Sequence, residues 1–147
     1  MNVMNVAFFG HRDTTQDIEQ KLEAVLISLI EDHDANTFYV GNQGNFDFIA
    51  RKILKKLKTI YPQITYTVVL AYMPGVRSEF DLSDYSDTMY PEGLENTPRK
   101  FAILKRNLWL IEHSDIVITY VRHYFGGAGK FKEIAEKKGK RIINIAD

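Results

Sequence analysis

Hydrophobic residues recur along this chain at two spacings, which predict strands and helices in alternation. Short runs rich in valine, isoleucine and aromatic residues predict strands, whereas apolar residues three or four positions apart predict amphipathic helices. Five strands are expected, at residues 3–9, 37–40, 64–70, 115–121 and 141–145. Four helices are expected between them, from a Thr14-x-x-Asp17 start to about residue 33 and then at about 46–60, 101–111 and 127–138.

The alternation of strands and helices predicts the fold class. Strands that are separated by helices pair in parallel through right-handed crossovers, which places the sheet between two helical layers. A chain of 147 residues, 45% hydrophobic, can bury one sizeable core but not two. We therefore predict an α/β fold in which residues 1–147 form a single doubly wound domain, with a mainly parallel sheet of about five strands flanked by helices.

The third predicted helix has an apolar face and an opposite stripe that carries arginine. The apolar face consists of Phe101, Leu104, Leu108 and Ile111, and the opposite stripe of Arg99, Ile103, Arg106 and Leu110. Arg106 is therefore not expected in the core. It either faces solvent, which its position favours, or reaches toward a ligand crevice.

The segment at about 72–98 interrupts the alternation. It contains three of the four prolines and shows no clear period, so we interpret it as a loop or lid over the site. Its part at 77–95 is acidic, and Asp81, Asp84 and Asp87 recur every third residue. The spacing does not match a calcium loop, so a solvated acidic segment is expected and no metal site is assigned.

The overall composition excludes several classes of function. Positive and negative side chains balance at 19 each, whereas a protein held to nucleic acid by its phosphates normally carries a basic excess, so nucleic acid is not the expected partner. The absence of cysteine excludes disulfides and thiolate catalysis. No apolar run is long enough to span a bilayer. We expect a cytoplasmic protein without a membrane partner.

Three predicted strand ends combine glycine with polar residues, and ligands of doubly wound sheets bind at such ends. The three segments are Gly10-His11-Arg12, Gly41-Asn42-Gln43-Gly44 and Gly126-Gly127-Ala128-Gly129-Lys130. The last one fits neither the Walker pattern nor Gly-x-Gly-x-x-Gly. It enters a helix, however, so its backbone N–H groups and the charge of Lys130 suit an anion. The alternative is an ordinary turn that needs glycine.

The remaining polar residues have a binding and a structural interpretation each. His11 and Arg12 suit a phosphate or a base edge, or they cap the turn and pair with the acidic segment. Asn42 and Gln43 suit ribose hydroxyls, or they are ordinary turn residues. Asp47 orients Asn42 and Gln43 for binding, or it only favours the start of its helix through the helix dipole. Glu133 also lies near a helix start, where the dipole alone favours an acid.

Four stretches together carry a family resemblance. NVAFFGHR contains Gly10 and Arg12, and NFDFIA contains Asp47 and Ala50. KRNLWLIEHSD places Arg106 nine residues before an aspartate, and FGGAGKFKE contains Gly126, Gly127, Gly129 and Glu133. Over nearly the whole chain, these stretches resemble the SLOG superfamily, which includes the DprA/Smf core, the LOG phosphoribohydrolases and the YpsA-like proteins. Lys130 stands where LOG has threonine.

The resemblance implies a Rossmann-like fold and a nucleotide crevice. It implies first a sensor or carrier that binds a nucleotide or an ADP-ribose-like molecule, with the phosphate at the GGAGK turn and no cofactor. The LOG pattern implies instead a nucleoside 5′-monophosphate phosphoribohydrolase, in which Arg106 and Glu133 cleave the N-glycosidic bond. The DprA pattern implies a single-strand DNA binding module. Family members pair through their helical faces, which implies a homodimer.

Overall fold

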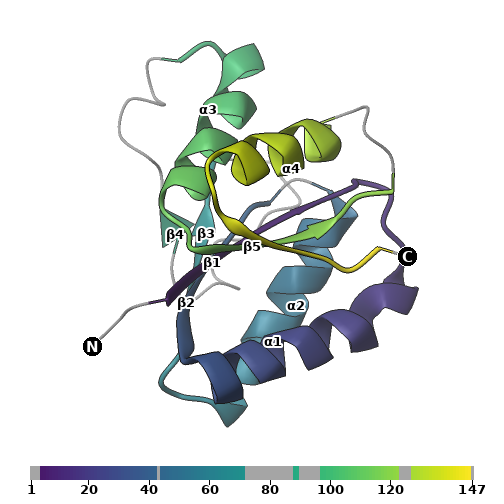
Figure 1. Ribbon diagram of the computed structural model, residues 1–147, viewed down its shortest axis with the longest axis vertical. Helices are drawn as coiled ribbons and strands as arrows, with labels where there is room; N and C mark the ends of the chain where they lie inside the picture. The colour runs from purple at the N-terminus through teal and green to yellow at the C-terminus, as the bar shows by residue number, and fades with distance from the viewer. Residues whose placement is uncertain (1–3, 43, 72–87, 90–96, 123–126, 147) are drawn as a thin grey trace, which may run out of the picture.

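The computed structural model describes residues 4–42, 44–71, 88–89, 97–122 and 127–146, and these form a parallel sheet between two layers of helices (Figure 1). The strands are β1 (Met4–Gly10), β2 (Ala35–Val40), β3 (Thr65–Val69), β4 (Thr88–Met89), β5 (Ile116–Tyr120) and β6 (Arg141–Asn144). Their order is β4-β3-β2-β1-β5-β6, and every neighbouring pair is parallel. The predicted α/β fold with five strands is confirmed, and the short β4 adds a sixth.

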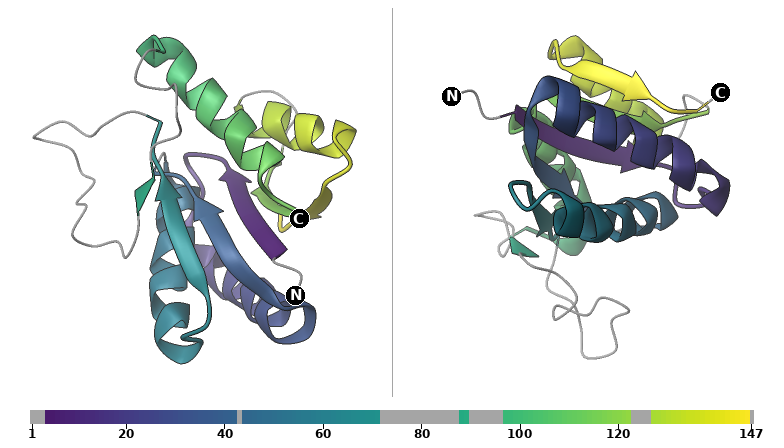
Figure 2. Two further views of the ribbon diagram at one scale, coloured as in Figure 1. Left: turned by 90° about the vertical axis from the view of Figure 1, so that its left-hand side faces the viewer. Right: turned by 90° about the horizontal axis from the view of Figure 1, so that it is seen from below.

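The helices lie in pairs on the two faces of the sheet. They are α1 (Glu19–His33), α2 (Asn45–Ile60), α3 (Arg99–Glu112) and α4 (Gly127–Lys137). Figures 1 and 2 show α1 and α2 on one face, and α3 and α4 on the other. The acidic segment at 77–95 and the predicted lid lie outside the described residues, apart from β4 and the two residues that precede α3.

Strand β1 supplies both layers of the core. Val6 and Phe8 pack into the cluster under α1 and α2, whereas Ala7 and Phe9 pack into the cluster under α3 and α4. All four side chains are buried. A strand that is covered on both faces explains why its sequence is a continuous apolar run rather than an alternation.

The side of helix α3 that is buried differs from the side that its sequence pattern predicts. Phe101, on the predicted apolar face, is 47% exposed, whereas Arg106 on the opposite stripe is only 3% exposed. The predicted face is therefore wrong at its first turn, and the preference for a solvent-facing Arg106 is also wrong. The guanidinium donates to the carbonyl of Val69 in β3 and to the side chain of Asn107 in α3, as described below, and the helical spacing alone does not reveal these acceptors.

The chain enters α1 through a 3-10 turn, Gln16–Ile18, and not directly at the predicted Thr14 start. The Thr14 hydroxyl donates a hydrogen bond to the carbonyl of His11 at 2.6 Å, so it closes the turn after β1 and does not cap the helix. None of the helices in the described part of the chain is long and apolar enough to cross a membrane.

The strand order reverses between β1 and β5. The chain builds β2 and β3 on one side of β1 and then crosses to place β5 on its other side. The carboxyl ends of β1 and β5 consequently diverge into connections on opposite faces, which opens a crevice in sheets of this kind.

Candidate ligand-binding site

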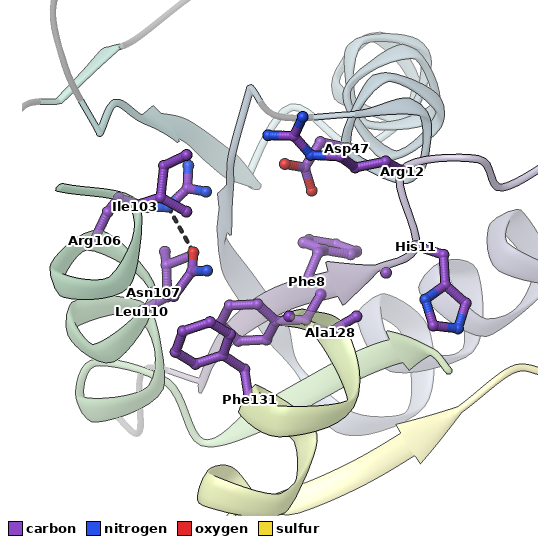
Figure 3. Close-up of a pocket in the computed structure, with 13 residues that line it drawn as sticks. Phe8, His11, Arg12, Asp47, Ile103, Arg106, Asn107, Leu110, Ala128 and Phe131 are labelled. Carbon is purple, nitrogen blue, oxygen red and sulfur yellow. Dashed lines mark hydrogen bonds between the residues drawn. The ribbon is translucent and has the colours of Figure 1, made fainter. Parts of the chain in front are cut away.

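A cavity of about 200 Å³ lies beyond the carboxyl end of β1, at the reversal of strand order. The end of β1, the start of α2, one side of α3 and the first turn of α4 surround it (Figure 3). Its lining consists of Phe8, Phe9, Gly10, His11, Arg12, Asp47, Ile103, Arg106, Asn107, Leu110, Gly127, Ala128 and Phe131. We call this cavity the switch-point pocket.

The turn after β1 is tied to the end of β5 through His11. The backbone N–H of His11 donates to the carbonyl of Tyr120 at 3.3 Å, and its Nε2 accepts from the backbone N–H of Arg122 at 2.9 Å. A ring nitrogen that accepts carries no proton, so the proton of the neutral imidazole is on Nδ1. His11 thus joins the two strand ends at which the order reverses.

The same turn is also joined to the start of α2. The backbone N–H of Asn45 donates to the carbonyl of Arg12 at 2.9 Å, and the Asn45 side-chain amide donates to the carbonyl of Thr14. Gly44 has φ +88°, and a Cβ there would come within 2.8 Å of the Arg12 Cα. Glycine at this position therefore permits both the backbone conformation and the close approach. These contacts fix the backbone from which the exposed Arg12 side chain lines the pocket.

Two buried charges, Asp47 and Arg106, converge at the floor of the pocket beside Gly41. They are 7% and 3% exposed. A Cβ on Gly41 would lie 2.5 Å from Arg106 Nη1 and 2.6 Å from Asp47 Oδ2, so both side chains occupy the space that glycine leaves free. Their charges are opposite, and opposite charges beside the same point offset part of the cost of burying each of them.

The Arg106 guanidinium donates hydrogen bonds to two acceptors. Its Nη1 donates to the carbonyl of Val69 at 3.0 Å, and its Nε donates to Oδ1 of Asn107 at 2.7 Å. Asn107 was not among the residues expected at the site. The available signal was its place next to Arg106 in the Lys-Arg-Asn stretch, because two polar residues in succession within a buried helix face indicate a shared polar site.

The glycine-rich turn contributes only part of its predicted residues to the pocket. Gly127 and Ala128, in the first turn of α4, line it, whereas Gly129 is buried and Lys130 is exposed, both outside the lining. Gly126 and Gln43 lie outside the described residues. The other residues of the second turn, Gly41, Asn42 and Gly44, adjoin the site but do not line the pocket.

Glu133, the other predicted catalytic residue, does not share the pocket with Arg106. Its side chain is 62% exposed and forms an ion pair of 3.3 Å with Lys137, one helical turn further along α4. It is not part of the pocket lining. Within the described ranges, no group of three or more histidine, aspartate or glutamate side chains is arranged to hold a metal ion.

The sequence matches no protein-family model and no curated protein. Among solved structures, the chain is similar to the DNA processing protein A (DprA) from Streptococcus pneumoniae, with a TM-score of 0.64 and 17% identity over 95% of this chain. The chain spans about half of that protein, 49% of its length. The chain therefore has a DprA-like Rossmann-type fold.

Proposed function

We propose that this domain belongs to the SLOG superfamily and binds a nucleotide or a nucleotide derivative in the switch-point pocket, as a sensor or carrier. One observation carries the proposal: the Arg12 side chain and the first turn of α4 line the same pocket, at the strand-order reversal. In the doubly wound fold, this is the place where ligands bind. We further expect a cytoplasmic homodimer, as the resemblance implies.

The first turn of α4 suits the phosphate of such a ligand. The N–H groups at the start of a helix have no partner within the helix, and the helix dipole adds partial positive charge there. The space at Gly127 is open, since a Cβ there would meet no atom within 4 Å. An anion can therefore approach the backbone closely, with the Arg12 guanidinium as its counter-charge.

The size of the pocket limits how much of a nucleotide it holds. Its volume of about 200 Å³ is below the range of roughly 300–1,000 Å³ in which drug-sized ligands bind. We infer that the sugar and the phosphate enter the pocket, while the base extends beyond it. The proposal therefore covers nucleoside monophosphates and ADP-ribose-like molecules alike.

A thermal-shift screen with nucleoside 5′-monophosphates and ADP-ribose tests the proposal. A ligand that binds only the native protein at 100 times its Kd stabilises it by about 2.7 kcal/mol. The unphosphorylated nucleosides are the matched controls and are expected to give no shift. If no phosphorylated compound raises the unfolding temperature, or if nucleosides raise it equally, the proposal is wrong.

A second candidate function, single-strand DNA binding, rests on the fold shared with DprA over 95% of this chain. In this alternative, Arg12 would contact a backbone phosphate of the strand. The balanced charge of the chain provides little general attraction to a polyanion. The alternative predicts oligonucleotide binding that weakens steeply with salt, and that strengthens with oligonucleotide length beyond a single nucleotide.

The phosphoribohydrolase alternative has less support. It requires a carboxylate beside the reacting sugar, and Glu133 is exposed, bound to Lys137 and outside the pocket lining. Among the residues that the structure describes, Asp47 is the carboxylate that lines the pocket, and it borders Gly41 together with Arg106. We therefore favour binding over hydrolysis.

A further inference from the structure

The amide of Asn107 has a fixed orientation. An arginine Nε–H only donates, so the atom of Asn107 that receives it at 2.7 Å is the carbonyl oxygen. The Nδ2 group, which only donates, is then on the other side of the amide. Figure 3 shows this nitrogen turned toward the interior of the switch-point pocket. Asn107 therefore presents N–H donors to a ligand, because its hydrogen bond with Arg106 fixes which side of the amide faces the pocket.

Asp47 presents the opposite chemistry to the same pocket. Its carboxylate reaches the pocket from α2, whereas Asn107 reaches it from α3 (Figure 3). A carboxylate accepts hydrogen bonds and donates none. The pocket thus combines donors, from Asn107, Arg12 and the start of α4, with an acceptor at Asp47. A ligand that satisfies it needs an anionic group and also a group that both donates and accepts.

We propose that Asn107 determines specificity: the group of the ligand that lies next to its Nδ2 must be a sugar hydroxyl. The ligand therefore contains an intact ribose. This inference rests on the proposed function. A hydroxyl is both a donor and an acceptor, so one of the vicinal 2′ and 3′ hydroxyls donates a hydrogen bond to Asp47 while the other accepts a hydrogen bond from Asn107 Nδ2. A group that only donates leaves the Asn107 N–H unsatisfied and repelled, which is costly at a residue that is only 8% exposed.

The Asn107→Asp variant separates this role from the support that Asn107 gives to Arg106. Aspartate has the same shape and keeps an oxygen for Arg106 Nε–H, but it replaces the donor that faces the pocket by an acceptor. The control Asn36→Asp adds the same charge at the amino end of β2, where Thr37 Oγ1 donates to Asn36 Oδ1 at 3.1 Å. An aspartate at this position keeps that hydrogen bond.

The experiment measures, by calorimetric titration, the affinity of each protein for adenosine 5′-monophosphate and for its 2′-amino and 3′-amino analogues. The pH is kept low enough to protonate the amines, since an ammonium group donates and cannot accept. In the wild type and in Asn36→Asp, we expect the analogue whose amine replaces the hydroxyl next to Asn107 to bind at least tenfold more weakly than the hydroxyl compound, and the other analogue not to be weakened in this way. In Asn107→Asp, we expect this preference to be lost or reversed for the first of these analogues.

The possible outcomes distinguish failure of this inference from failure of the proposed function. If Asn107→Asp weakens all three compounds by the same factor, the added charge alone is responsible and the inference is wrong, while the proposed function stands. If Asn107→Asp binds all three as the wild type does, Asn107 only supports Arg106 and the inference is again wrong. If the wild type binds none of the three, the proposed function fails for this nucleotide, and the inference fails with it.

Discussion

Phe46 lies directly over the Cα of Gly10, so that a Cβ on Gly10 would come within 2.2 Å of Phe46 Cγ. The Phe46 side chain is fully buried and stacks with Tyr120 at 6.4 Å between ring centroids. It cannot give way without disturbing the end of β5. Forcing an extra group into a packed core costs about 1–3 kcal/mol, so we predict a loss of about 3 kcal/mol in the free energy of unfolding for Gly10→Ala, measured by denaturant titration.

Gly127→Ala is the matched control for this substitution. A Cβ at Gly127 meets no atom within 4 Å, and alanine favours the helix more than glycine does. Its free energy of unfolding is expected to equal or exceed that of the wild type by up to about 1 kcal/mol. Equal stability of Gly10→Ala and Gly127→Ala would show that Phe46 does not exclude a side chain at position 10.

Arg106→Met tests the buried polar floor of the pocket. The substitution leaves the carbonyl of Val69 and Oδ1 of Asn107 without their donor, and it leaves the buried Asp47 carboxylate without the neighbouring positive charge. Removing one partner of a buried pair of opposite charges lowers the free energy of unfolding by about 3–5 kcal/mol. We expect a loss of this size in chemical denaturation. The surface substitution Arg141→Gln should change the free energy of unfolding by less than about 0.5 kcal/mol, and a comparably small loss for Arg106→Met would contradict the account.

Tyr61 and Glu31 predict a specific response to high pH. The Tyr61 hydroxyl donates to the Glu31 carboxylate, and this hydrogen bond raises the pKa of Tyr61 above its usual 10.0. The unfolded chain therefore loses this proton first, so the contribution to stability is complete below pH 10.0 and is lost as the pH rises further. We expect the stability of the wild type to fall more steeply above pH 10 than that of Tyr61→Phe, followed by denaturation at each pH. Parallel pH profiles would show that the hydrogen bond contributes nothing.

Glu133→Gln separates binding from hydrolysis. Because Glu133 is outside the pocket and paired with Lys137, its substitution should leave nucleotide affinity within about twofold of the wild type, which is less than one ordinary hydrogen bond contributes. Release of ribose 5-phosphate should be absent from both proteins. If the wild type releases ribose 5-phosphate and Glu133→Gln does not, the hydrolase alternative replaces the binding proposal.

The sequence was sufficient for the elements whose burial gives a simple pattern, which is a helical period or a continuous apolar run. β1 could be predicted because Val6 to Phe9 are covered on both faces, and the predicted order of strands and helices follows from such runs. The orientation of α3 could not be predicted in the same way. Arg106 is buried because Val69, Asn107 and Asp47 surround it, and two of these three come from other elements of the fold.

The candidate site shows the same limit. The strand ends that bear glycine were visible in the sequence, and Gly10, Arg12 and Gly127 do line one pocket. Glu133 could also be identified from its motif, but the direction of its side chain depends on how α4 packs against the sheet. The signal for Asn107 was limited to its place beside Arg106, because its orientation is set by a hydrogen bond to the neighbouring guanidinium.

The most direct test of the central claim compares Arg12→Gln with Arg141→Gln in calorimetric titrations with adenosine 5′-monophosphate and ADP-ribose. Both variants remove one exposed positive charge, but Arg12 lines the switch-point pocket, whereas Arg141 begins β6 at the other end of the strands. A hydrogen bond to a charged group contributes about 1.5–3 kcal/mol, so Arg12→Gln should bind at least tenfold more weakly while Arg141→Gln matches the wild type. Equal affinities of the two variants would contradict a phosphate site at the switch point.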